Sequence, residues 1–336
     1  DPHDGNTGHA SSHWEGDGNG SDLNGDCSGA SKDFRYGETV IGIGDTNGDG
    51  AHELMVASYQ WYLDCPEGTG TYGEWDDAVV WWCSNQGGRA FVYNGREGGL
   101  NTDHIATMRG DGESDHFARS VITSGDFNGD GIDDIIIGAS SADPNGSNSG
   151  ETYIIYGVAN GSSANKYLPD MYGYTGFKIN GINEGDSSGR SVSSAGDFNG
   201  DGIDDIIIGA YGADPDGKSF AGESYVVYGS DTRSAAALDL SDLNGTNGFT
   251  INGIDANDYS GTSVSSAGDV NGDGIDDLII GAGVADPDGN SRAGESYVVY
   301  GVAGADVSSK RSFDLGLHSS SENLTLTGSD NIKGLG

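Results

Sequence analysis

The chain has 336 residues, of which 53 are acidic and 15 are basic, so its formal net charge is −38 at pH 7. A nucleic-acid-binding surface needs an excess of lysine and arginine, and this composition excludes one. No run of about 18 apolar residues occurs, which excludes a membrane-spanning helix. Sixty glycines and a hydrophobic content of 34% favour many tight turns around a modest core.

A short pattern of Asp, Asn and Gly occurs four times, each time directly before an apolar run. The copies are GDTNGDGAHELMV (44–56), GDFNGDGIDDIIIGA (125–139), the identical GDFNGDGIDDIIIGA (196–210) and GDVNGDGIDDLIIGA (268–282). Each loop offers side-chain oxygens at positions 1, 3, 5 and 9, and a carbonyl at position 7. This spacing suits a hard cation such as Ca²⁺. The glycine at position 6 permits the sharp turn that such a loop needs.

The predicted metal ligands are the same five positions in every loop, and about four structural Ca²⁺ ions are expected. In chain order they are Asp45, Asn47, Asp49, Ala51 and Glu53, then Asp126, Asn128, Asp130, Ile132 and Asp134, then Asp197, Asn199, Asp201, Ile203 and Asp205, then Asp269, Asn271, Asp273, Ile275 and Asp277.

The EF-hand is the competing interpretation of these loops, and two features exclude it. An EF-hand needs a bidentate Glu at position 12, where the four copies have Val56, Ile137, Ile208 and Ile280. It also needs a helix on each side, whereas here the loop leads into a short β-branched run that ends at Gly. That run is typical of a buried strand.

The repeated unit is much longer than the loop, because equivalent Asp residues lie 71 residues apart from Asp126 to Asp197 and 72 apart from Asp197 to Asp269. Besides the strand after the loop, three strand-like segments recur in each unit. They are 39–45, 120–126, 191–197 and 263–269; 88–95, 150–157, 222–229 and 294–301; and 105–110, 177–182, 249–254 and 324–329. Four short strands per unit without helical periodicity predict an all-β chain, a β-propeller of four-stranded antiparallel blades. A β-solenoid is disfavoured because its repeats are shorter.

These units resemble FG-GAP repeats, the blades of the integrin α-subunit head and its bacterial relatives. The resemblance rests on Phe34-Arg35-Tyr36-Gly37 and Phe117-Ala118 before the first strand, on the D-x-N-x-D-G-x-x-D/E loop, and on Ile-Gly-Ala after it. It implies Ca²⁺ in each loop on one rim of the propeller, and binding of macromolecules through the opposite face. That family usually builds seven blades, whereas four are legible here.

The units predict a division of the chain into an N-terminal arm, a propeller and a short tail. The arm is 1–33, the propeller 34–330 with blades at about 34–110, 111–182, 183–254 and 255–330, and the tail 331–336. The ring could close with four blades, gain a degenerate fifth from the arm, or belong to a larger assembly. The weak likeness of the tail to the lead-in of calcium repeats suggests that the natural chain continues beyond Gly336.

Calcium loops of modest affinity work where calcium is about millimolar, so we expect a secreted, extracellular or cell-surface protein. Three cysteines allow one disulfide. Cys65 and Cys83, both within the insertion 59–87 of the first unit, are the favoured pair, and pairings with Cys27 are the alternative.

Four further groups of residues invite a functional interpretation. The insertion 59–87 is rich in aromatic residues, including Trp81 and Trp82, and could contact a glycan or protein or simply pack on itself. Arg109-Gly110-Asp111 matches a tripeptide of integrin ligands, a match that chance easily produces. His3, His9 and His13 could collect a transition metal but are better interpreted as a solvated arm. His52 lies inside the first loop and His104 and His116 flank the start of the second unit, where a polysaccharide lyase could use such a histidine with a tyrosine.

No catalytic motif is recognisable, so an enzyme is the less favoured interpretation. The sequence predicts an extracellular calcium-binding propeller for adhesion, surface assembly or matrix and glycan binding. Its expected partner is an extracellular glycan or protein, with self-association possible. The alternatives are a secreted carbohydrate-active enzyme similar to a polysaccharide lyase, or an architectural subunit of an extracellular filament.

Overall fold

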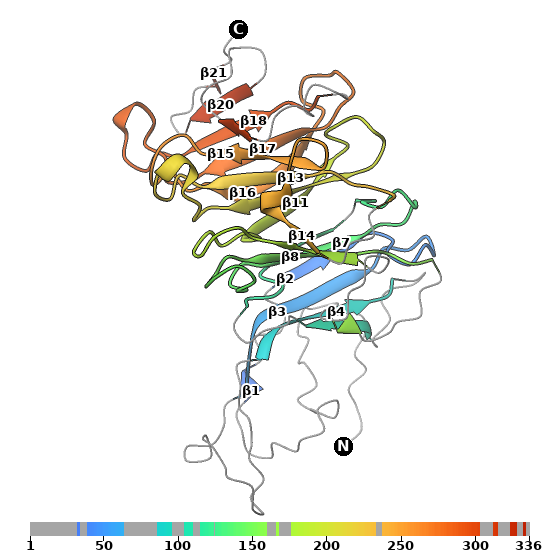
Figure 1. Cartoon of the computed structure of the whole chain (residues 1–336). Coiled ribbons are helices and arrows are strands. Elements are labelled where there is room, and N and C mark those ends of the chain that lie inside the picture. The colour runs from blue at the N-terminus through green and yellow to red at the C-terminus, as the bar shows by residue number, and fades with distance from the viewer. Residues whose placement is uncertain are drawn as a thin grey trace, which may run out of the picture.

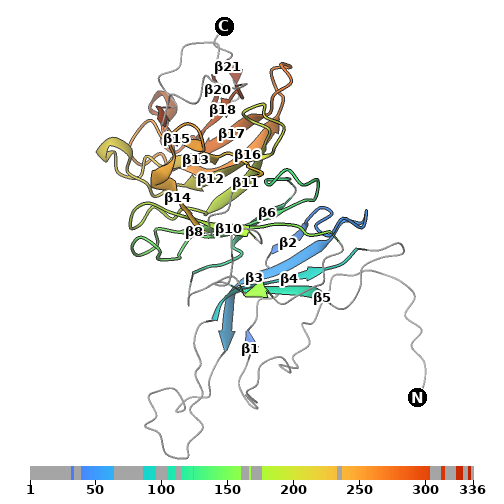
Figure 2. The same cartoon turned by 45° about the vertical axis from the view of Figure 1, so that its right-hand side comes forward.

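The computed structural model places four β-sheets one after another in chain order, from the blue N-terminal sheet to the red C-terminal one (Figure 1). It describes residues 32–33, 39–63, 86–95, 104–109, 115–123, 125–159, 166–167, 176–232, 237–302, 312–314, 323–327 and 332–333. The view turned by 45° shows the same succession of sheets (Figure 2).

Each sheet has a core of four antiparallel strands in which neighbours along the chain are neighbours in space. The first contains β2 (Thr39–Gly42), β3 (Leu54–Leu63), β4 (Gln86–Tyr93) and β5 (His104–Arg109). The second contains β6 (Ser120–Thr123), β7 (Ile135–Ala139), β8 (Glu151–Ile155) and β10 (Gly176–Asn180). The third contains β11 (Ser191–Gly196), β12 (Asp205–Ala210), β13 (Glu223–Val227) and β15 (Gly248–Asn252). The fourth contains β16 (Ser260–Gly268), β17 (Asp277–Ala282), β18 (Glu295–Val299) and β20 (Asn323–Thr327).

The first three sheets each take an extra strand from the next repeat. β9 (Lys166–Tyr167) pairs in parallel with β5, β14 (Ala237–Asp239) with β10, and β19 (Ser312–Asp314) with β15. In each case the connection between the third and fourth strands of one blade reaches back to the outer strand of the preceding blade. At the two ends of the array, β1 (Lys32–Asp33) pairs with β3 and β21 (Ile332–Lys333) with β20.

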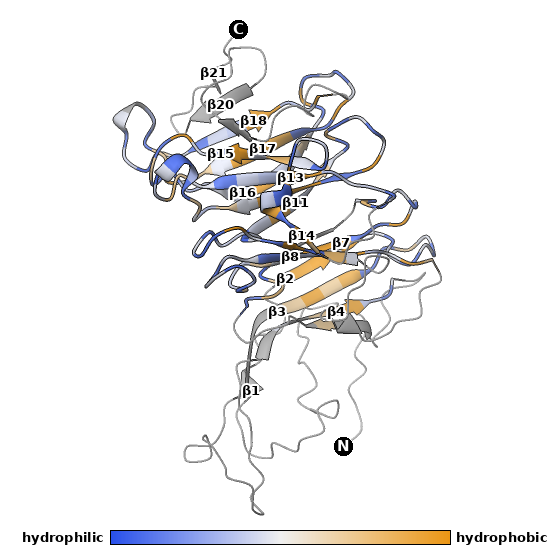
Figure 3. Ribbon diagram, in the orientation of Figure 1, coloured by the Kyte–Doolittle hydropathy of each residue, from blue (hydrophilic) through white to orange (hydrophobic). Residues whose placement is uncertain are grey.

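The central strands are buried along their whole length because a neighbouring sheet covers each of their faces. All residues of β7, β8 and β12 are buried, which explains the continuous apolar runs, such as Ile135–Ile137, in place of an alternating pattern. Three hydrophobic clusters lie between consecutive sheets, and each takes residues from two adjacent repeats. In Figure 3 orange is concentrated in strands such as β3, β7 and β17, while many of the loops at the edges of the stack are blue.

The predicted fold class is confirmed. The described residues are all-β, with four antiparallel sheets that follow one another as propeller blades do, and they contain no α-helix. Only short 3₁₀ turns occur there: η2 (Pro215–Gly217), η3 (Leu240–Asp242) and η4 (Pro287–Gly289). Within the described strands no pairing joins the first sheet to the fourth.

Adjacent blades approach so closely that some strand positions have no room for a Cβ atom. A Cβ on Gly209 of β12 would lie 2.0 Å from the carbonyl oxygen of Gly261 in the next blade. It would also lie 2.4 Å from Ser191 Oγ of its own blade. At the equivalent Gly281 of the fourth blade, only a serine hydroxyl, Ser263 Oγ, lies that near, again at 2.4 Å.

These two glycines form a matched pair for testing the contact between blades. We expect Gly209→Ala to lower the free energy of unfolding by about 1–3 kcal/mol more than Gly281→Ala, because a backbone carbonyl cannot rotate away as a hydroxyl can. Urea unfolding of both variants measures the difference. Equal losses would show that the neighbouring blade does not restrict Gly209.

Candidate metal loops and blade junctions

The four Asp/Asn/Gly loops lie directly before the second strand of each sheet, and each folds around its own side-chain oxygens. In the second loop, Asp126 Oδ1 and Asn128 Oδ1 both accept the N–H of Asp130, each at 2.9 Å. Asp126 Oδ2 accepts the N–H of Gly131 at 2.7 Å, and Gly131 has φ +85°, a conformation that favours glycine. Because positions 1 and 3 share one donor, their oxygens converge.

The same local hydrogen bonds recur in every loop. Position 5 donates to positions 1 and 3, position 6 donates to position 1, and position 7 donates to position 5, at 2.7–3.0 Å throughout. Four segments far apart in the chain therefore adopt one conformation. The spacing of the polar residues, rather than the surroundings of any one copy, determines it.

The acidic residue at position 9 lies beneath each loop and is buried. Asp134 has 0% of its surface exposed; its Oδ2 accepts the N–H of Phe127 at 2.9 Å, and its Oδ1 accepts that of Gly157 at 2.8 Å. The pKa of Asp134 is raised to about 8, mainly by burial; the two N–H donors lower it, and the nearby Asp130 and Asp126 add to the rise. A cation at this point would relieve that unfavourable accumulation of negative charge.

The three other loops also bury their acid at position 9. Burial raises the pKa of Asp205 to about 8, and it raises the pKa of Glu53 above its usual value as well. Asp277 is fully buried, and its two oxygens accept the N–H groups of Val270 and Gly301 at 2.8 and 2.9 Å. Position 9 is therefore the point where each loop and the strand after it are fixed together.

The predicted ligand sets are suited to calcium in their chemistry but do not form ready-made cages. Among the described residues, no three acidic, histidine or cysteine side chains gather closely enough to hold a metal. In the third loop Asn199 Nδ2 lies 3.0 Å from Asp201 Oδ2 and 3.4 Å from Asp205 Oδ1. The amide thus bridges two acids, and rotation about its last torsion would turn Oδ1 toward a cation between them. The loops fit a calcium ion after that rearrangement.

The acid at position 8 has a different role, which the sequence did not reveal. Asp133 Oδ2 accepts the N–H of Asp45 in the preceding blade at 2.8 Å. The equivalent bonds run from Asp126 to Asp204 Oδ2 at 2.9 Å and from Asp197 to Asp276 Oδ2 at 3.1 Å. Each of these side chains joins its own loop to the loop of the blade before it. The four loops therefore follow one another along one edge of the stack.

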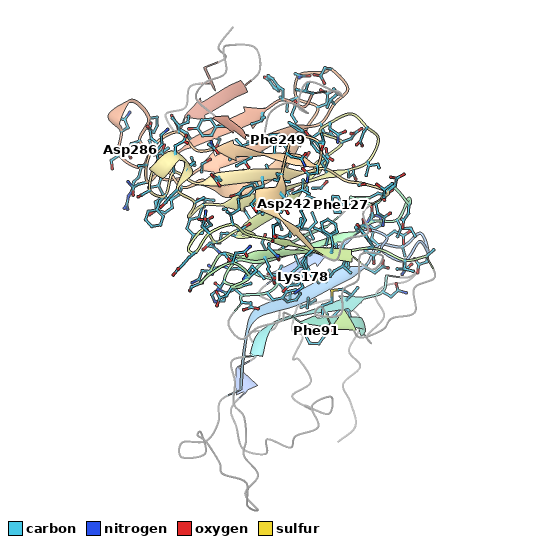
Figure 4. The ribbon with its side chains drawn as sticks, in the orientation of Figure 1. Phe91, Phe127, Lys178, Asp242, Phe249 and Asp286 are labelled. Carbon is cyan, nitrogen blue, oxygen red and sulfur yellow. The ribbon has the colours of Figure 1, made fainter. Side chains whose placement is uncertain are left out.

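The opposite edge carries the loops between the second and third strands. Figure 4 places Asp286, in one of these loops, and Phe127, in a metal loop, toward opposite edges of the stack. In the third blade, Asp214 Oδ1 accepts the N–H of Phe220 at 2.6 Å, and Phe220 is 44% exposed. Its ring stacks on Tyr259 at 5.4 Å between centroids, and Tyr259 lies 6.0 Å from Tyr211. Three aromatic rings thus gather at this edge, across the third and fourth blades.

The other residues singled out in the sequence contribute little to a described site. His116 Nδ1 lies 2.7 Å from Ser141 Oγ and joins two loops of one blade, and its pKa is lowered by burial and by Arg119 and Arg190. The three cysteines, the N-terminal histidines, Trp81, Trp82, the Phe34–Gly37 motif and residues 110–111 lie outside the described residues. His104 and Arg109 are the ends of β5.

Comparison with known proteins identifies the repeats. The FG-GAP repeat model matches residues 117–155, 188–227 and 260–299, which are parts of the second, third and fourth blades. The first blade lies outside those matches, but its strand order is the same. Three of the four blades therefore contain FG-GAP repeats, and these repeats form propeller-type blades.

Relatives of known name align with somewhat more than half of the chain. Integrin alpha pat-2 of Caenorhabditis elegans is 32% identical over 208 residues, 60% of this chain and 15% of the relative. Phosphatidylinositol-glycan-specific phospholipase D is 31% identical over 199 residues in Bos taurus and 33% over 199 in Dictyostelium discoideum. The matched region makes up 22% and 20% of those two proteins. Within the described part of this chain, no helix is long and apolar enough to cross a membrane.

Removing one position-8 carboxylate tests the bond between loops. We expect Asp204→Ala to lower the free energy of unfolding by about 1–3 kcal/mol, because the N–H of Asp126 loses its acceptor. Asp204→Asn keeps an acceptor oxygen and should lose less. His52→Ala at the equivalent position of the first blade is the control, expected to change stability by less than about 0.5 kcal/mol in dilute protein. If Asp204→Ala lowers the free energy of unfolding no more than His52→Ala does, the Asp204 carboxylate does not stabilise the contact between the two loops.

The buried acids at position 9 predict an unusual pH dependence of stability when a chelator has removed metal ions. The pKa of Asp134 and that of Asp205 lie near 8 in the folded chain, against 3.8 ordinarily, so the folded state holds more protons than the unfolded state between these values. Stability should therefore rise as pH falls from about 8 toward 5, and Asp134→Asn should weaken this rise. Thermal melting at several pH values measures it, and a chelated protein that loses stability over the same interval contradicts the assignment.

Proposed function

We infer that the four loops bind Ca²⁺ and that the chain is a calcium-stabilised, extracellular propeller of the adhesion type. The observation that carries the proposal is the repetition of one loop conformation, in which oxygens at positions 1 and 3 converge above a buried acid at position 9. The ligand set in each copy is the one predicted from the sequence, with the carbonyl of position 7 completing it.

Calcium also accounts for the charge of these loops. Each concentrates acids at positions 1, 5 and 9, and the last is buried, so a divalent ion would replace mutual repulsion by attraction. If each site has a dissociation constant near ~0.1 mM, ~2 mM calcium stabilises the folded chain by about 1.8 kcal/mol per site. Four such sites approach the whole stability of a typical domain, about 5–15 kcal/mol. A chain of this kind is suited to surroundings with millimolar calcium, outside the cell.

A calcium titration followed by melting tests the proposal directly. We expect the melting temperature to rise with calcium, to rise less with magnesium, and to fall when chelator is added. In Asp205→Asn, which keeps the size of the side chain but removes one charge, the calcium-dependent rise should shrink by about a quarter. A melting temperature that is the same with calcium and with chelator would overturn the calcium sites.

The edge opposite the metal loops supplies the surface for a macromolecular partner. Phe220, Tyr259 and Tyr211 form an aromatic group there, and such side chains anchor both glycan and protein contacts. Phe220 and Tyr259 have φ of +53° and +55°, a conformation that costs free energy for bulky residues. An exposed aromatic ring at Phe220, stacked on the half-buried Tyr259 and held in a strained backbone, favours a binding role. The similarity to integrin alpha chains supports an adhesive role.

Binding of the purified chain to immobilised polysaccharides and extracellular matrix proteins in calcium tests this surface. We expect Phe220→Ala to lower the affinity at least tenfold for any probe that the wild type binds, as loss of a central aromatic anchor does. Val158→Ala, at a valine that is 50% exposed after β8, should bind normally. Binding that Phe220→Ala leaves unchanged, or absence of binding to every probe, would contradict the assignment.

A further inference from the structure

The blades have two different faces, and the three junctions between them all use these faces in the same way. We call the face toward the preceding blade the leading face, and the face toward the following blade the trailing face. In the junction of the third and fourth blades, Phe198 and Ile207 belong to the trailing face, and Val264 and Leu278 to the leading face. The clusters between the first and second blades and between the second and third repeat this pairing.

The fourth blade exposes part of its trailing face, although Val298, the cross-strand partner of Ile279, is only 4% exposed. Val270 is 53% exposed, whereas the equivalent Phe127 and Phe198 are 1% and 2% exposed in the second and third blades. Ile279 is partly exposed, whereas its equivalent Ile207 is fully buried. The exposed side chains of this face remain apolar although no described segment of the chain covers them.

The first blade exposes its leading face in the same manner. Val40 is 59% exposed, and its equivalents Val192 and Val264 are 0% and 7% exposed. Leu54 is partly exposed, whereas Leu278 at the same position of the fourth blade is fully buried. Val56, the cross-strand partner of Val40, is 5% exposed, so the chain has a partly exposed trailing face at one end and a partly exposed leading face at the other.

The contacts between the Asp/Asn/Gly loops are also incomplete at the first and fourth blades. A Cβ on Gly44 or Gly196 would lie 2.1 Å from a position-8 carboxylate of the next blade, but nothing lies within 4 Å of that point at Gly268. In the first blade position 8 is His52, which has no preceding loop to contact among the described residues. A neutral imidazole nitrogen can accept an N–H as a carboxylate does. His52 would also avoid the acid-beside-acid arrangement of the inner junctions, where Asp133 lies against Asp45.

We propose that the trailing face of the fourth blade binds the leading face of the first blade of a second copy of this chain, in a head-to-tail junction that repeats the inner ones. A second copy is the occupant that supplies both missing faces at once, with apolar surfaces of the shape that already pack three times within the chain. His52 of one copy then lies next to the Asp269 loop of the other. Such a junction closes into a ring if the rotation between copies permits, and otherwise continues as a filament. The junction does not depend on the adhesive role proposed above.

Two single-face variants test the junction and its polarity together. Val270→Asp blocks the trailing face and Val40→Asp blocks the leading face, both at exposed positions where folding should persist. We expect the wild type to associate in sedimentation at ~0.15 M salt, which screens the acidic surfaces, with calcium present. Each variant alone should be monomeric. An equal mixture of the two should form a dimer and nothing larger, because it contains one intact face of each kind per pair.

The matched control is Val158→Asp, at a valine of comparable exposure outside both faces, which should associate as the wild type does. Melting curves of all variants confirm that they are folded. Three results would overturn the proposal. They are a monomeric wild type at every concentration, a Val270→Asp protein that still dimerises through an isologous contact, or a mixture of the two variants that stays monomeric.

Discussion

The structure depends on one constraint: a blade of this sequence is apolar on both faces and cannot be stable alone. Ile206 and Ile208 of β12 point to the preceding sheet while Ile207 points to the following one, and all three are buried. Burying each such side chain is worth about 1.5–3 kcal/mol, so each junction contributes much of the stability of the two blades it joins. The exchange of β9, β14 and β19 between sheets adds hydrogen bonds to these junctions.

The metal loops divide their acids between two tasks. Positions 1, 3, 5 and 9 organise the turn within a blade, and position 8 joins it to the blade before. In the second loop Asp134 is buried beneath its own loop, while the adjacent Asp133 extends to Asp45. Of these two neighbouring aspartates, Asp134 therefore holds its own loop and Asp133 binds the loop of the preceding blade. Because Asp133 and Asp134 are adjacent in the chain, a cation that orders the loop would also order the junction with the preceding blade.

The sequence predicts the fold well because its signals are local and repeated. The β-branched run after each loop and the recurring order of four strands are enough to predict antiparallel blades. The strand exchange was not predictable, because Lys166–Tyr167 and Ala237–Asp239 are short and pair with segments about 60 residues away. The role of Asp133, Asp204 and Asp276 was also missed. The single signal for it was His52, the one copy of position 8 that is not an acid.

The aromatic group of Phe220, Tyr259 and Tyr211 shows the same limit. Its members are separated by up to 48 positions and come together only because the loop of the third blade meets the segment leading into the fourth. The N–H of Tyr259 donates to the carbonyl of Phe220 at 3.0 Å, so the backbone itself brings the rings together.

Hydrogen exchange of the loop amides tests the junction-based account most directly. In the monomeric Val270→Asp chain, the N–H groups of Asp45, Asp126 and Asp197 should exchange as slowly as those of the central strands, and that of Asp269 much faster. Equal exchange at all four would contradict it.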